Sequence, residues 1–96
     1  MSSLHLDLRK KMQEILQLSL KDMEHKAYES LIRDELHQVT TEIFKILNKH
    51  GIQNVHDMDK WFQEGKIDEA EGWEDFFTLD ALEYKQRELK AILKDL

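Results

Sequence analysis

The chain contains no proline and only three glycines among its 96 residues, and this shortage of turn-forming residues limits its folds more than any other feature. Proline and glycine are the residues that most often interrupt helices and shape tight turns. With 41% hydrophobic and 35% charged residues, the composition is typical of a packed helical protein and not of a disordered segment. We therefore predict a single all-α domain over residues 1–96, since a chain of this length supports one hydrophobic core.

Apolar residues recur at helical spacing and predict four helices, over residues 4–18, 22–49, 55–64 and 69–95. The first two apolar stripes point in different directions, so we expect a break between these helices near residues 19–22. Either Ser19 or Asp22 can cap the second helix.

The fourth helix is expected to continue past Thr78, because good helix formers flank it and no glycine follows it in the chain. These elements predict an irregular up-and-down four-helix bundle, in which two long helices pack antiparallel and the short third helix turns the corner.

Acidic and aromatic residues are concentrated between residues 57 and 83. This segment carries ten acidic and two basic residues, and it includes five of the eight aromatic residues of the chain. Aromatic anchors dominate many interfaces, and acidic neighbours favour a basic partner. We therefore choose the following candidate partner-binding residues: Trp61, Asp57, Asp59, Glu69 and Glu74.

Other aromatic residues of this segment have a structural interpretation. Trp73, Phe76 and Phe77 share one side of a helix, and such a face is more often core than interface. We expect these three rings to pack in the core near Met58, and Trp61 is the aromatic residue of this segment that we expect to be partly exposed.

The sequence contains no motif typical of an enzyme. It has no cysteine, no glycine-rich phosphate loop and no serine in a nucleophile motif, so we predict no catalytic residue, no cofactor and no small-molecule substrate. The net charge of −6 disfavours nucleic acid as a partner. Its apolar runs are too short to cross a membrane, and no targeting signal is evident, so we expect a cytoplasmic protein.

A metal site is the main chemical alternative. Carboxylates and imidazoles are common metal ligands, and the candidates in this chain are Glu35, Glu42, His50, His56 and Asp57. Their spacing matches no metal-binding motif, so our preferred interpretation includes no metal. A small metal-dependent hydrolase or a metal-binding helical protein is kept as the alternative function.

These observations favour a non-enzymatic module for protein interaction or assembly that presents residues 57–83 to a protein partner. Its apolar faces exceed what a compact core of this size usually covers, so a homodimer is about as well supported as a monomer. A further alternative is an acidic protein that blocks the nucleic-acid-binding surface of its partner, because the same segment would serve that purpose.

Overall fold

The computed structural model describes the backbone of residues 3–65 and 69–96, and the side chains of residues 7–54, 56–58, 60, 63–65 and 72–96. Within these ranges the chain forms four helices and no strand. The helices are α1 (Ser3–Leu16), α2 (Leu20–Lys49), α3 (Val55–Gln63) and α4 (Glu69–Asp95). The prediction of an all-α fold with two long helices and a short third helix is therefore confirmed.

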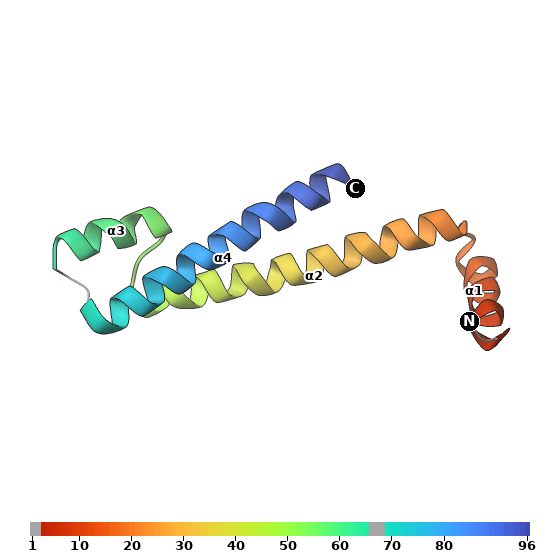
Figure 1. Cartoon of the computed structure of the whole chain (residues 1–96), viewed down its shortest axis with the longest axis horizontal. Coiled ribbons are helices and arrows are strands. Elements are labelled where there is room, and N and C mark those ends of the chain that lie inside the picture. Colours follow the sequence, from red (N-terminus) through yellow and green to blue (C-terminus); the bar gives the residue numbers. More distant parts are fainter. Residues whose placement is uncertain (1–2, 66–68) are drawn as a thin grey trace.

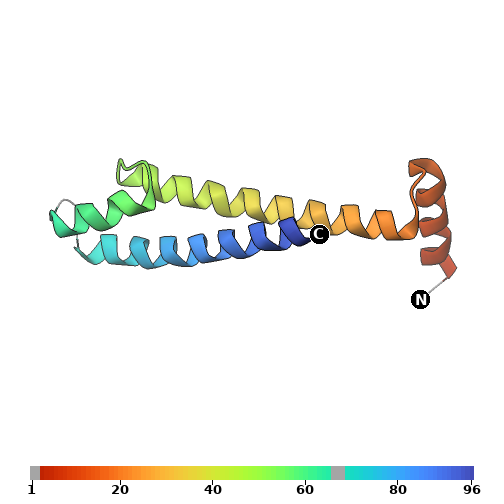
Figure 2. The ribbon, with the colours of Figure 1, turned by 90° about the horizontal axis from the view of Figure 1, so that it is seen from above.

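The two long helices, α2 and α4, form an antiparallel hairpin with α3 in the connection between them (Figure 1). α2 continues past the C-terminal end of α4, and α1 lies across the far end of α2, as both views show (Figures 1 and 2). The molecule measures 62 × 24 × 19 Å and has a radius of gyration of 20.3 Å. A compact chain of this length has a radius of gyration of about 12–13 Å, so this protein is elongated.

Polar side chains cap the starts of two helices. The Ser19 hydroxyl accepts a hydrogen bond from the backbone N–H of Asp22 at 3.1 Å, and this bond caps α2 after the break from α1. The Asn54 side chain accepts from the backbone N–H of Asp57 at 2.9 Å and caps α3 in the same way. The cap at Ser19 was expected from the sequence, and the cap at Asn54 follows the same rule, because serine and asparagine oxygens can replace the missing helical acceptors.

α4 is continuous across Thr78, as expected. The Thr78 hydroxyl donates to the carbonyl oxygen of Glu74 at 3.0 Å. This bond within the helix uses the side chain that would otherwise cap a new helix, so no interruption is needed at this position.

The core lies between α2, α3 and α4, near the turn of the hairpin. Its buried apolar residues are Val39, Ile43, Leu47, Ile52, Met58, Leu79 and Leu89. The α2 members follow the predicted spacing of three or four residues. We use the name closed end for this packed region, residues 36–58 and 72–89.

The prediction that Trp73 and Phe77 fill the core is wrong, because these side chains are 47% and 64% exposed. Phe76 does pack against the core. The inward side of α4 is set by Gly72 and Leu79, which are seven residues apart and both buried. Trp73 and Phe77 each follow an inward-facing position by one residue, which turns them by about 100° toward solvent.

Candidate protein interface

Three aromatic rings form a cluster on the outer flank of α4, and we call Trp73, Phe76 and Phe77 the aromatic face. The rings of Trp73 and Phe77 stack with centroids 5.6 Å apart and an interplanar angle of 27°. Phe76 meets Trp73 edge to face at 6.0 Å. Because Phe76 also packs on the core, the cluster is held in place, while Trp73 and Phe77 stay partly exposed.

Two exposed acidic residues, Glu74 and Asp80, lie near the aromatic face on α4. Among the predicted partner-binding residues, Glu74 is exposed beside it and Asp57 is half-buried at the start of α3. The side chains of Trp61, Asp59 and Glu69 lie outside the described residues, so the structure does not place them. The acidic character of the segment is therefore represented at this surface by the exposed residues Glu74 and Asp80.

Sequence reasoning did not select Trp73 and Phe77 as interface residues, although a signal for their exposure exists. Gly72, Leu79 and Gln86 recur every seven residues, and such a repeat fixes the inward side of a helix that packs on one partner. Gln86 belongs to this seam and donates from its amide nitrogen to the Thr40 hydroxyl at 3.2 Å. If glycine and glutamine are counted as possible inward-facing residues, this repeat predicts that Trp73 and Phe77 lie on the outer flank of α4.

An ionic cluster closes the hairpin beside the aromatic face. Asp75 on α4 lies 2.6 Å from the Nε2 atom of His50 and 3.0 Å from the Nζ atom of Lys49, both at the end of α2. The His50 and Asp75 side chains are only 11% and 17% exposed. A basic residue at a helix C-terminus also interacts favourably with the helix dipole, so this cluster holds the first turns of α4 against the end of α2.

The environment of Asp75 favours its charged form. Partial burial by itself raises the pKa of this carboxyl group, but hydrogen bonds and charges from His50 and Lys49 outweigh it. The pKa of Asp75 is therefore lower than its ordinary value of 3.8. The carboxylate stays ionised and bound to its partners at neutral pH.

The candidate metal ligands on α2 take part in a contact between helices. Glu35 accepts a hydrogen bond from Lys85 on α4 at 2.5 Å. This bond and the nearby charges of Glu35 and Glu42 raise the pKa of Lys85 above its usual value. Both carboxylates therefore lie close to a lysine, an arrangement typical of the edge of a helical seam.

The remaining metal candidates are His50, His56 and Asp57, near the turn of the hairpin. His50 pairs with Asp75, while His56 is exposed on α3 and Asp57 lies in the first turn of that helix. Among the side chains that the structure describes, no group of three or more histidines and carboxylates is arranged to hold a metal ion.

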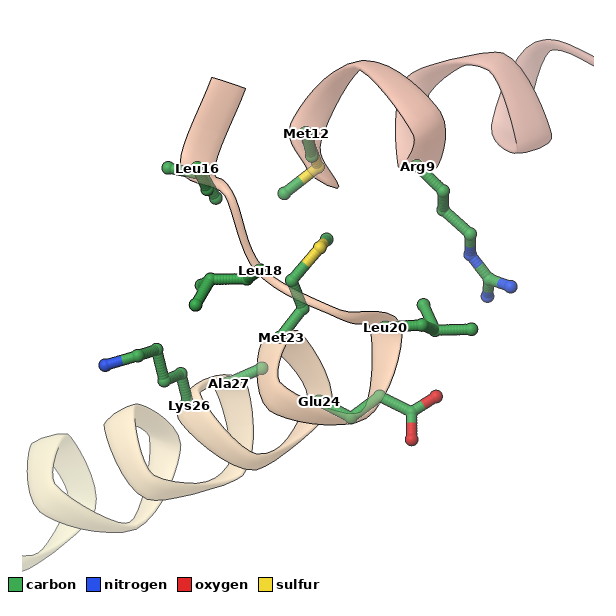
Figure 3. Close-up of a pocket in the computed structure, with 9 residues that line it drawn as sticks. All are labelled: Arg9, Met12, Leu16, Leu18, Leu20, Met23, Glu24, Lys26 and Ala27. Carbon is green, nitrogen blue, oxygen red and sulfur yellow. The ribbon is translucent and has the colours of Figure 1, made fainter. Parts of the chain in front are cut away.

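A second surface lies at the other end of the molecule, where α1 meets α2. A cleft of about 470 Å³ opens there between the two helices. Figure 3 shows Met12 on α1 and Met23 on α2 pointing toward one another across it, while Arg9 extends from α1 toward α2 beside Leu20. Leu16, Leu18, Leu20 and Ala27 also line this mostly apolar cleft.

The fold and these surfaces define an elongated helical hairpin with an aromatic, acidic face near one end and an apolar cleft near the other. The chain belongs to the family described as the uncharacterized protein MJ0235 family, which matches residues 1–96. No curated protein and no solved structure matches it. In the ranges that the structure describes, none of the helices combines the length and the apolar character required to cross a bilayer.

Proposed function

We propose that this chain is a non-enzymatic interaction module that binds a basic protein partner through the aromatic face and the acidic residues around it. The observation that carries the proposal is the stacked pair of Trp73 and Phe77, exposed by 47% and 64% on a rigid helix. Large aromatic residues on a preorganised element are the side chains that most often dominate binding energy.

The expected gain from covering these two rings is large enough to support binding. An aromatic side chain buries about 150–250 Å² when fully covered, so each half-exposed ring still offers about 100 Å². At roughly 25 cal/mol per Å², covering each ring contributes roughly 2–3 kcal/mol before the costs of association. Two such anchors side by side fit the centre of a protein interface, where binding energy is concentrated.

Charge supports a basic partner over a neutral or acidic one. Residues 57–83 carry ten acidic and two basic side chains. Of the acidic residues near the aromatic face, Asp75 is paired inside the hairpin, whereas Glu74 and Asp80 face solvent. Complementary charge at the rim of an interface speeds association and selects among partners.

The test is affinity capture with the full chain as bait, using an extract of the organism that makes it. Wild type and the Trp73→Ala and Tyr84→Ala variants are compared side by side. Tyr84 is a matched control because it is 59% exposed on the same helix but lies outside the aromatic face. We expect wild type and Tyr84→Ala to capture one common basic protein, and Trp73→Ala to lose it.

Calorimetry with the purified partner then measures the effect of each substitution. We expect Trp73→Ala to weaken binding by at least about tenfold, the effect of losing one buried anchor, and added salt to weaken the wild-type complex further. A Trp61→Ala variant tests, in the same assay, the aromatic residue that the sequence analysis selected for partner binding. Equal binding by wild type and Trp73→Ala would contradict the proposal.

The captured partner also decides whether the module is an acidic blocker of nucleic-acid binding. If so, the chain competes with nucleic acid for the partner in a binding assay, and Trp73→Ala competes less well. If the partner binds this chain and nucleic acid at the same time, the aromatic face serves in assembly and does not block nucleic-acid binding.

A further inference from the structure

The far end of the molecule has an apolar surface that its own chain leaves uncovered. We call α1 together with residues 20–31 of α2 the arm. Seven large apolar residues of the arm are each between 39% and 80% exposed: Leu8, Met12, Ile15, Leu16, Leu20, Tyr28 and Leu31. The most exposed of them is Ile15, at 80%.

α4 is not positioned to cover this surface. At 100° per residue, Leu20 and Leu31 point in nearly the same direction, whereas Val39 and Ile43 are turned from Leu31 by about 80° and 120°. The apolar side of α2 therefore changes direction between its two halves. The core residues of its C-terminal half face α4, whereas Leu20 and Leu31 point to another side. The first turns of α2 extend beyond the end of α4 (Figure 2).

The shape of the arm suits a helix as its occupant. α1 crosses the end of α2, and the cleft of about 470 Å³ lies in the angle between them. The cleft is apolar at its centre, where Met12 and Met23 face each other (Figure 3). Methionine side chains adapt to irregular partners, so such a cleft can accept the apolar side of another helix.

The charge of the arm favours a second copy of the same chain. Residues 1–31 carry five basic and five acidic side chains, so two arms meet without net repulsion. In contrast, two copies of residues 57–83, each with ten acidic and two basic residues, repel one another. Self-association is therefore compatible with the arm and unfavourable at the aromatic face.

The exposed apolar area also matches what a dimer requires. A fully buried aliphatic side chain removes roughly 100 Å² of apolar surface from water, so the seven exposed residues offer on the order of 400 Å². A standard interface buries about 800 Å² per partner, of which a little over half, about 450 Å², is apolar. The arm alone approaches that value.

We propose that a second copy of the chain covers the arm, with α1 of each copy packing into the cleft between α1 and α2 of the other. An interface that uses the same patch on both copies closes as a twofold dimer. It does not involve the aromatic faces, which lie at the opposite ends of the hairpins. This dimer does not depend on that partner.

The test measures mass by light scattering, at concentrations from below one to hundreds of micromolar. We expect wild type to approach about 23 kDa, twice the 11.5 kDa of the single chain. Ile15→Glu, which adds charge at a highly exposed position, is expected to weaken dimerisation by at least about tenfold. Phe44→Glu is the matched control, because Phe44 is 55% exposed on α2 outside the arm and its variant should stay dimeric.

Hydrogen exchange provides a second readout that does not depend on a substitution. Amides of α1 and residues 20–31 should be better protected at high concentration than at low concentration, while those of the closed end should not change. A wild-type mass that stays near 11.5 kDa at every concentration would overturn the proposal. It would also be overturned if Ile15→Glu remained dimeric, or if only Phe44→Glu became monomeric.

Failure of the dimer and failure of the proposed function are distinguishable. A monomeric Ile15→Glu variant that still captures the basic partner through Trp73 separates the two surfaces. Loss of partner capture with an intact wild-type dimer concerns only the aromatic face.

Discussion

The closed end and the arm are built from the same kinds of helix, yet only the closed end has a core. All the buried apolar residues among those described lie between Val39 and Leu89, and residues of the arm such as Ile15 and Leu31 are largely exposed. The difference arises because α2 packs along α4 at one end, where α3 also packs on α4, and has only the crossing helix α1 at the other. Helical periodicity therefore creates an apolar face at both ends, but topology decides which face is covered.

The endings of α1 and α2 show the same contrast. A left-handed residue follows each helix, directly after α1 and one residue beyond His50 after α2. In both cases the next N–H donates five residues back: Leu18 to Gln13 at 3.3 Å and Ile52 to Leu47 at 3.0 Å. The left-handed residue after α2 is Gly51, and Ile52 then enters the core. After α1 it is Gln17, which adopts this conformation at a higher energetic cost than glycine does.

The largest effect should come from removing a core side chain. Leu79 is completely buried, so Leu79→Ala should lower the free energy of unfolding by about 2–5 kcal/mol. Leu31→Ala in the arm, where the side chain is 65% exposed, should change it by less than about 0.5 kcal/mol. Chemical denaturation at submicromolar concentration measures both without a contribution from association, and similar losses would contradict the contrast between the two regions.

A smaller effect is expected at the ionic cluster of the closed end. Asp75→Asn should lower the free energy of unfolding at pH 7 by about 1–2 kcal/mol, because it removes charge-assisted hydrogen bonds at a partly exposed site. The pKa of Asp75 is lower in the folded chain than its ordinary value of 3.8. Its contribution is therefore complete above that value and is lost as the pH falls through the lower folded pKa.

Acid titration of unfolding checks this sign. Wild type should lose more stability than Asp75→Asn as the pH falls below 3.8. Asp80→Asn is the control, since Asp80 is exposed on the same helix. If the two variants behave alike, the cluster does not stabilise the hairpin.

The smallest effect compares the two helix caps. Ser19→Ala and Asn54→Ala each remove a cap worth about 1 kcal/mol. Asn54→Ala should lower the global stability, because α3 packs on the core. Ser19→Ala should leave global stability nearly unchanged at low concentration and increase hydrogen exchange about fivefold in the first turns of α2, because the arm opens locally. Equal global losses would show that the arm unfolds together with the closed end.

Much of the fold could be predicted from local signals. The apolar spacing of Val39, Ile43 and Leu47, the caps at Ser19 and Asn54 and the lack of proline are properties of short segments, so one sequence was enough to read them. The exposure of Trp73 and Phe77 was not predictable in this way, because it depends on which side of α4 meets α2. Gly72 and Gln86 belong to that side, and neither is apolar enough to count in a search for hydrophobic stripes.

For the candidate site, the sequence predicted which residue types are present but not how they are arranged in space. Segment 57–83 is acidic and aromatic in any fold, but the pairing of Asp75 with His50 joins residues 25 positions apart and requires the hairpin. That pairing removes one acidic side chain from the surface and leaves Glu74 beside the rings. The metal candidates Glu35 and His50 were close to partners on α4 that spacing along α2 could not reveal.

The length of α2 has a consequence of its own. Thirty residues at 1.5 Å each make a helix about 45 Å long, so α2 holds the two ends of the protein at a fixed separation. Seven residues inserted near its middle would lengthen α2 by about 10 Å and rotate one end of the helix relative to the other by only about 20°. In the proposed twofold dimer joined at the arms, this helix would set the distance between the two aromatic faces.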